Sequence, residues 1–166
     1  MKIGRHGLID HLRLIAPLFG FIAAVWALRI VIYAAGAPRF SLEMRVVSVT
    51  AADGIAVLLT VLMIHRRNFG GYTSVVVAVF LLSCWEQILI SAAIVFTALT
   101  GIANVYAAPD FAFVPGLWHH AAGHLTIGIG SSAIFGSAMG CILFWMLRRA
   151  DSHRTADAGH AIGGKR

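Results

Sequence analysis

Charged side chains are scarce in this sequence. Only 12% of its residues are Asp, Glu, Lys or Arg, whereas 59% are hydrophobic. A soluble domain normally carries about 25% charged residues, so this chain lacks the side chains to cover a water-facing surface. Its polar residues gather between long apolar runs, which is typical of a polytopic helical membrane protein. We therefore expect an all-α fold, a four-helix transmembrane bundle with no separate soluble domain.

Cysteine is nearly absent as well. The two cysteines, Cys84 and Cys141, lie inside apolar runs and form no Cys-x-x-Cys motif, so a redox relay or zinc knuckle is not indicated. The net charge of +6 does not indicate nucleic-acid binding. The basic residues flank the apolar runs, where Lys and Arg set the topology and contact anionic lipid. The expected partner is the lipid bilayer, and no nucleic acid is expected.

Four apolar runs are long enough to cross a bilayer. We expect helices at about residues 14–35, 46–64, 73–100 and 117–147, all within one transmembrane domain over residues 1–149. The first run is longer than the ~7–15 residues of a signal-peptide core, so we expect it to be retained as a helix. Residues 150–166 are polar and are expected to form a disordered or only locally ordered tail.

The basic residues also indicate a topology. They occur near the N-terminus, at residues 65–71 and after the fourth run, whereas residues 101–117 contain no Lys or Arg and residues 36–45 contain two. The positive-inside rule then places both termini in the cytoplasm, and four crossings satisfy this arrangement. Arginine outnumbers lysine and alanine is abundant, which is typical of a GC-rich bacterial genome. We expect a multi-pass protein of the bacterial cytoplasmic (inner) membrane.

The fourth run carries three histidines in its first turns, His119, His120 and His124. An ionisable side chain within the bilayer is costly and usually has a partner or a task. His120 and His124 are four residues apart and share a helical face, whereas His119 points about 100° away. With a rise of ~1.5 Å per residue, His120 and His124 lie ~5 Å and ~10 Å below the outer boundary.

The other three helices each place an ionisable group in the same half of the bilayer. The same rise puts Arg29 at ~9 Å, Asp53 at ~10 Å and Glu86 at ~15–20 Å from the outer side. We expect Arg29 and Asp53 to form an ion pair, because an unpaired charge in the bilayer is expensive. That leaves Glu86 to face the histidines, with Gln87 nearby.

These residues predict a candidate site for a transition metal ion such as Cu, Fe or Zn. Two histidines at i and i+4, together with one or two carboxylates, can complete such a site. The expected ligands are His120, His124, Glu86 and Asp53, with Arg29 and His119 in support. Haem is the less favoured cofactor, because a b-type haem needs axial ligands from two helices. Only His11 and His65, at the inner side, offer such a pair.

Two alternatives remain open beside the metal site. In the first, the same residues form a satisfied polar core of a purely structural or accessory subunit without chemistry. In the second, the protein is a proton-coupled transporter in which Glu86 titrates near the middle of the membrane. The leading hypothesis is a small integral membrane protein, a subunit of a larger complex, with a polar and candidate metal-binding site.

Small residues follow the histidine pair along the same helix. Gly128, Ser132, Gly136 and Gly140 recur at steps of four. Small residues at this spacing let a neighbouring backbone approach closely. We expect this small-residue stripe to pack against another helix, and to mediate self-association or contact with other membrane subunits.

Overall fold

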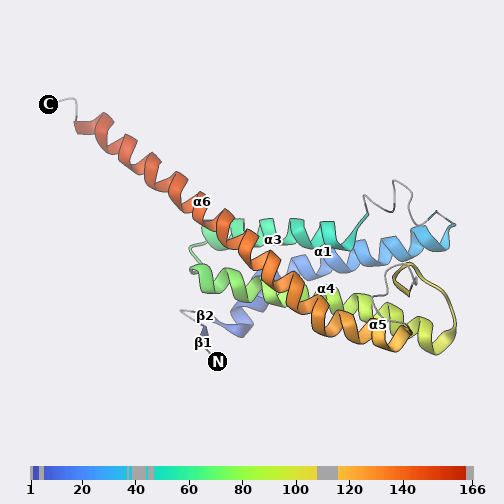
Figure 1. Ribbon diagram of the computed structural model, residues 1–166. Coiled ribbons are helices and arrows are strands. Elements are labelled where there is room, and N and C mark those ends of the chain that lie inside the picture. The colour runs from blue at the N-terminus through green and yellow to red at the C-terminus, as the bar shows by residue number, and fades with distance from the viewer. Residues whose placement is uncertain are drawn as a thin grey trace.

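The chain folds into long helices that lie side by side (Figure 1). The structure, a computed structural model, describes residues 2–3, 6–36, 38, 44, 47–107 and 116–163. Its main helices are α1 (Leu8–Ala34), α3 (Val49–Arg66), α4 (Tyr72–Thr100), α5 (Leu117–Gly123) and α6 (Ile129–Gly163). The 3-10 helix η1 (Val105–Ala107) follows α4, and the π-helix η3 (His124–Gly128) joins α5 to α6. Ahead of α1, the two-residue strands β1 (Lys2–Ile3) and β2 (His6–Gly7) pair antiparallel.

Four helical stretches of the described residues are long and apolar enough to cross a membrane. They are Leu8–Ala34, Val49–Arg66, Tyr72–Thr100 and Leu117–His153. The last stretch combines α5, η3 and the first part of α6. The predicted all-α fold and the four candidate spans are therefore confirmed, and they indicate a multi-pass membrane protein.

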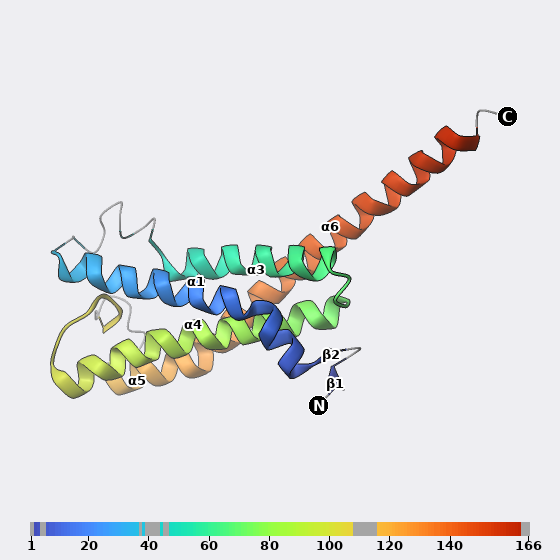
Figure 2. The ribbon, with the colours of Figure 1, turned by 180° about the vertical axis from the view of Figure 1, so that it is seen from behind.

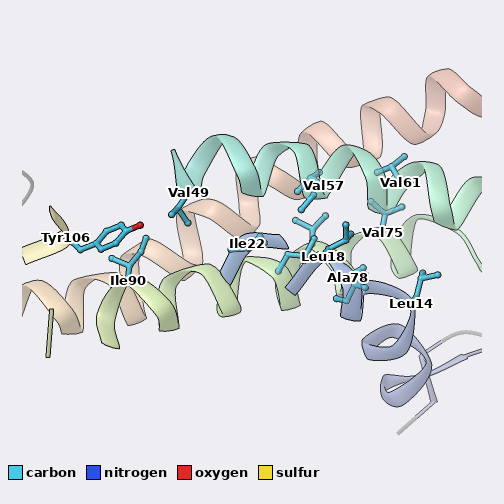
Figure 3. Close-up of a cluster of buried hydrophobic side chains, with 14 of the residues drawn as sticks. Leu14, Leu18, Ile22, Val49, Val57, Val61, Val75, Ala78, Ile90 and Tyr106 are labelled. Carbon is cyan, nitrogen blue, oxygen red and sulfur yellow. The ribbon is translucent and has the colours of Figure 1, made fainter. Parts of the chain in front are cut away.

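The central helix is α4, which packs against α1, α3, α5 and α6. The views from the two sides show α6 running obliquely across the other helices and extending past them at its C-terminal end (Figures 1 and 2). Where α1, α3 and α4 meet, the apolar core contains Leu18, Val57, Val75 and Ala78 (Figure 3). Because α4 contacts every other long helix, its polar residues are placed to meet side chains from several elements.

Glycines allow α6 to approach α3 and α4 closely. A Cβ atom at Gly136 would lie 2.8 Å from Cγ1 of Val79, and one at Gly140 would lie 3.0 Å from Cγ1 of Val75. The expected close packing of the small-residue stripe on another helix is therefore found. Gly136 and Gly140 face valines of α3 and α4 of the same chain, and a role of the stripe in self-association or contact with other membrane subunits stays a prediction.

The helix boundaries differ from expectation at both ends of the chain. α1 begins at Leu8 rather than near residue 14, because Asp10 Oδ2 accepts a hydrogen bond from the Gly7 amide at 2.8 Å and caps the first turn. α6 continues to Gly163, where we expected a helix end near residue 147 and a disordered or only locally ordered tail. No proline interrupts this segment, and its alanine and arginine residues favour helix. Residues 108–115 of the expected outer loop, and the expected helix start at residue 46, lie outside the described residues.

Candidate functional site

His120 and His124 face each other at the beginning of the fourth candidate span. Their Nε2 atoms are 3.2 Å apart, and their ring centroids are 5.0 Å apart. His120, on α5, is 5% exposed, and His124 is half-buried at the start of η3. His119 is exposed. The predicted shared face of His120 and His124 is confirmed, and we call these two residues the histidine pair.

The direct partner of the histidine pair is Gln87 of α4. Its Oε1 atom lies 2.7 Å from Nδ1 of His124, while its Nε2 atom donates to Oε2 of Glu86 at 3.2 Å and to Oγ of Ser132 at 3.3 Å. A Cβ atom at Gly128 would lie 2.5 Å from Oε1 of Gln87. The glycine at this position therefore makes room for a buried amide rather than for a backbone.

Glu86 lies behind Gln87 and reaches the histidine pair only through the Gln87 amide. Its side chain is 2% exposed. Asp53 of α3 acts on it electrostatically, and the Thr50 side chain also approaches it. Asp53 is 7% exposed, and its Oδ1 atom has no hydrogen-bond partner in the part of the chain that the structure describes. Two carboxyl groups from neighbouring helices thus share one buried region.

Arg29 does not neutralise Asp53. Within the described ranges, no ion pair joins these two residues, so the predicted Arg29–Asp53 pair is wrong. The Arg29 guanidinium instead lies over the ring of Tyr106, 5.5 Å from its centroid, and Trp26 stacks on the same ring at 6.4 Å. Tyr106 is in η1, outside the candidate spans, and its burial raises its pKa despite the nearby Arg29 charge. The composition of residues 101–117 gave no signal that a tyrosine would fold back over the bundle.

The four expected metal ligands do not come together. Among the residues that the structure describes, no group of three or more His, Cys, Asp and Glu side chains is arranged to hold a metal ion. The histidine pair meets, but Gln87 takes the place that we expected for Glu86. Adjacent helical residues point about 100° apart, so only one of Glu86 and Gln87 can face His124.

The two histidines considered for haem have separate partners. Nδ1 of His11 lies 2.9 Å from the Gly7 carbonyl oxygen, and its ring packs edge-on against Phe69. Nε2 of His65 lies 2.9 Å from Oδ2 of Asp151. The geometry therefore does not favour a shared axial-ligand pair on the inner side.

A cavity of about 460 Å³ borders the histidine pair. Its lining comes from one face of α5, η3 and α6 and is formed by His119, His120, Gly123, His124, Ile127, Gly128 and Ser131. This volume falls within the range of small-molecule sites, about 300–1,000 Å³. Among the described residues of the wall, the polar side chains are the imidazole rings and Ser131, so the histidines supply most of its chemistry.

The cavity follows an irregular part of the helix. η3 has π-helical hydrogen bonding over five residues, and nothing in the sequence pattern predicted it. Short π-helical segments within α-helices are rare and frequently occur at functional sites. Here the segment begins at His124 and ends at Gly128, and both residues lie beside the Oε1 atom of Gln87.

Comparison with known proteins adds no further identification. No protein-family model, curated protein or solved structure matches the chain. Inferences about function therefore depend on the geometry of the site.

Proposed function

We propose that the chain is a small multi-pass membrane protein with a proton-coupled binding site, in which Glu86 holds the proton and the histidine pair contacts the ligand. The observation that carries this proposal is the continuous hydrogen-bonded chain from His120 through His124 and Gln87 to Glu86. Its links measure 3.2, 2.7 and 3.2 Å. These hydrogen bonds connect a cavity to a buried carboxyl group. A buried carboxyl group in a membrane protein commonly serves proton relays.

When Glu86 is ionised, every link in the chain has one direction. A carboxylate only accepts hydrogen bonds, so Gln87 donates from Nε2 and presents Oε1 to His124. His124 then carries its proton on Nδ1 and accepts at Nε2, which makes His120 the donor at its own Nε2. Nδ1 of His120 is left as an acceptor, and this buried atom has no partner among the described residues.

A proton on Glu86 allows each of these links to reverse. The carboxylic acid donates to the Gln87 carbonyl, so the amide turns and presents its N–H group to His124. His124 accepts at Nδ1 and donates from Nε2, and His120 holds its proton on Nδ1. In the proposed coupling, ionised Glu86 makes His120 an acceptor at Nδ1, and protonated Glu86 lets it donate there.

Gln87 transmits the direction of the hydrogen bonds but does not conduct the proton, because a neutral amide does not readily accept and release a proton. The series of hydrogen bonds is thus suited to coupling ligand binding at His120 to the protonation of Glu86, rather than to conducting a proton. Coupling is reciprocal: a ligand that donates to His120 favours ionised Glu86, and one that accepts from His120 favours protonated Glu86. Asp53, Thr50 and Gln87 are the groups that act on Glu86 from α3 and α4.

The proposed setting is the bacterial cytoplasmic membrane, with both termini in the cytoplasm and the histidine pair in the outer half of the bilayer. The distribution of Lys and Arg supports this orientation. We further propose that the protein works as a subunit of a larger membrane complex. Purification in a mild detergent, followed by identification of co-purifying proteins, tests that part directly.

The test of coupling compares the wild type with Glu86→Gln in lipid nanodiscs, using ¹⁵N-labelled histidine and NMR at alkaline pH. The new amide at position 86 can donate to the Gln87 carbonyl, as a protonated acid would. We expect the proton to move from Nδ1 to Nε2 on His124 and from Nε2 to Nδ1 on His120. The tautomers should stay as in the wild type in Asp53→Asn, because Asp53 makes no hydrogen bond within the chain of links. Identical tautomers in the wild type and Glu86→Gln would contradict the proposal.

A transition metal ion held by the histidine pair is the second candidate. Two nitrogen ligands at ~2.0–2.1 Å from a tetrahedral zinc ion are about 3.3 Å apart, close to the 3.2 Å between the two Nε2 atoms. Gln87 would then orient His124 through its Nδ1–H group, as an outer-shell partner does. The remaining ligands would have to enter from the cavity, since no described carboxylate joins the pair.

Metal analysis distinguishes this candidate from a metal-free site. The purified wild type should contain about one Cu, Fe or Zn ion per chain, and His120→Ala/His124→Ala should contain none. His119→Ala is the matched control, because His119 lies on the same helix but outside the pair. Equal metal content in the wild type and the double variant would reject the metal site.

A further inference from the structure

A second cavity lies at the other end of α4, beside the turn that joins α3 to α4. Its volume is about 600 Å³. Unlike the cavity at the histidine pair, it has a strongly polar wall, formed by Ile64, His65, Asn68, Gly70, Gly71, Thr73, Ser74, Phe144, Arg148 and Asp151. The proton-coupled site does not involve any of these residues, so this cavity needs its own explanation.

The N-terminal end of α4 forms part of this wall. α4 is 29 residues long, its N-cap is Gly71, and it has neither a side-chain cap nor an acidic residue in its first turn. The first amide groups of a helix have no partner within the helix and carry its partial positive charge. Because Gly71 and Thr73 line the cavity, these amides border the space in which an anion would lie.

Ser74 gives an independent indication of a ligand. Its side chain is only 4% exposed and lines the cavity, yet its hydroxyl forms no hydrogen bond within the described part of the chain. The Ser74 amide donates to the Gly71 carbonyl at 3.0 Å, which fixes the residue in the first turn of α4. A side chain at position 70 would collide with Oγ of Ser74, so Gly70 leaves this hydroxyl uncovered.

The charge of the wall is also suited to an anion. Arg148 lines the cavity, with its guanidinium 5.9 Å from the centroid of the Phe144 ring. Asp151, the carboxylate among the described residues of the wall, is paired with Nε2 of His65 at 2.9 Å. The guanidinium of Arg148 and the first amides of α4 are therefore the donors that the wall offers to an anion.

We propose that this cavity binds a phosphate group, carried by an anionic lipid headgroup or by a free phosphate ion. Uncapped helix amides, a buried hydroxyl and a guanidinium supply the donors that phosphate oxygens bind in proteins. The turn lies where two candidate membrane spans end, at Arg66 and Tyr72, which is the level expected for lipid headgroups.

Native mass spectrometry of the full chain in detergent tests the proposal and separates the two sources. The probes are dioleoyl phosphatidylglycerol, dioleoylglycerol, which has the same chains without phosphate, and inorganic phosphate. A lipid headgroup site predicts one phosphatidylglycerol per chain and at least about tenfold weaker binding of dioleoylglycerol. A free-phosphate site predicts binding of inorganic phosphate with no preference between the two lipids.

Two variants locate the binding. Arg148→Gln should weaken binding of the preferred probe by about tenfold, and Ser74→Ala by about threefold to tenfold, because each removes a hydrogen bond to a charged group. Arg149→Gln is the matched control: it removes the same charge one residue away, but its guanidinium lies over Trp145 and does not line the cavity. Its affinity should stay within about twofold of the wild type.

Two results would overturn the proposal. One is that neither phosphatidylglycerol nor inorganic phosphate binds to the wild type. The other is that Arg149→Gln weakens binding as much as Arg148→Gln, which would reduce the effect to general surface attraction. Because Ser74→Ala changes one small side chain, loss of binding in that variant with an unchanged unfolding temperature would rule out misfolding as the cause.

Discussion

The two halves of the contact that α4 makes with η3 and α6 use the same spacing of small residues in different ways. In one half, which we call the valine half, Gly136 and Gly140 let the backbone of α6 approach the valine methyl groups of α4. In the other half, the polar half next to the histidine pair, Gly128 makes room for the amide of Gln87 instead. Small residues at steps of four thus predict that a neighbouring element approaches closely, but they do not predict whether apolar or polar groups meet them.

The two halves also differ in what they contribute to stability. Close packing in the valine half gains dispersion energy and can tolerate little added volume. The polar half has to satisfy buried hydrogen-bonding groups, which are costly when left without partners. Steric changes in the first half should therefore outweigh the loss of single hydrogen bonds in the second.

The largest effect is expected from Gly136→Leu. A Cβ atom at this position already lies 2.8 Å from Val79 Cγ1, so a larger side chain would push α6 away from α4. We expect the free energy of unfolding to fall by about 3 kcal/mol, measured by thermal or denaturant unfolding in detergent. Gly130→Leu is the control, because Gly130 is exposed and a Cβ there meets nothing within 4 Å. Equal stability of the two variants would show that the valine half is not tightly packed.

An intermediate effect is expected from Gln87→Leu. This change leaves Glu86 and Nδ1 of His124 without the hydrogen-bond partners that Gln87 provides. We expect a loss of about 2 kcal/mol in the same unfolding assay. The double variant Gln87→Leu/His124→Leu should be less destabilised than the sum of the two single variants, since it removes both ends of one hydrogen bond. Strict additivity would mean that the two residues do not interact.

The smallest effect is expected from Ser132→Ala. The hydrogen bond from Gln87 Nε2 to Ser132 Oγ is 3.3 Å long, and the same nitrogen also donates to Glu86. Its loss should lower the free energy of unfolding by about 0.5 kcal/mol. Ser131→Ala serves as the comparison, because the exposed Ser131 hydroxyl bonds only to carbonyl groups of its own helix. A loss in Ser132→Ala larger than in Gln87→Leu would reverse the assigned order of these two contacts.

The four spans were predictable because bilayer thickness sets the length of a crossing helix and every run met it. The shared face of His120 and His124 was predictable from the helical repeat alone. The choice between Glu86 and Gln87 was not, because a shift of one residue in helix rotation exchanges the two. Periodicity does not supply that rotation.

The surroundings of Arg29 were unpredictable for a different reason. Its contact with Tyr106 depends on how η1 folds back over the bundle, and loop conformation carries no periodic signal. Depth alone suggested Asp53 as its partner, but equal depth does not bring two side chains together. The length of α6 was underestimated because polarity argues against a membrane span and not against a helix.

The π-helix η3 affects how the histidine pair is oriented relative to Gly136 and Gly140 in the last candidate span. Four residues of an α-helix turn through about 400°, so a stripe at steps of four drifts by about 40° per step. A π-helical turn contains one residue more than an α-helical turn. The direction in which the histidine pair points is therefore set separately from the direction in which Gly136 and Gly140 point. Deletion of one residue between His124 and Gly128 would remove this additional residue, so the histidine pair and the glycines would then follow one continuous α-helical repeat.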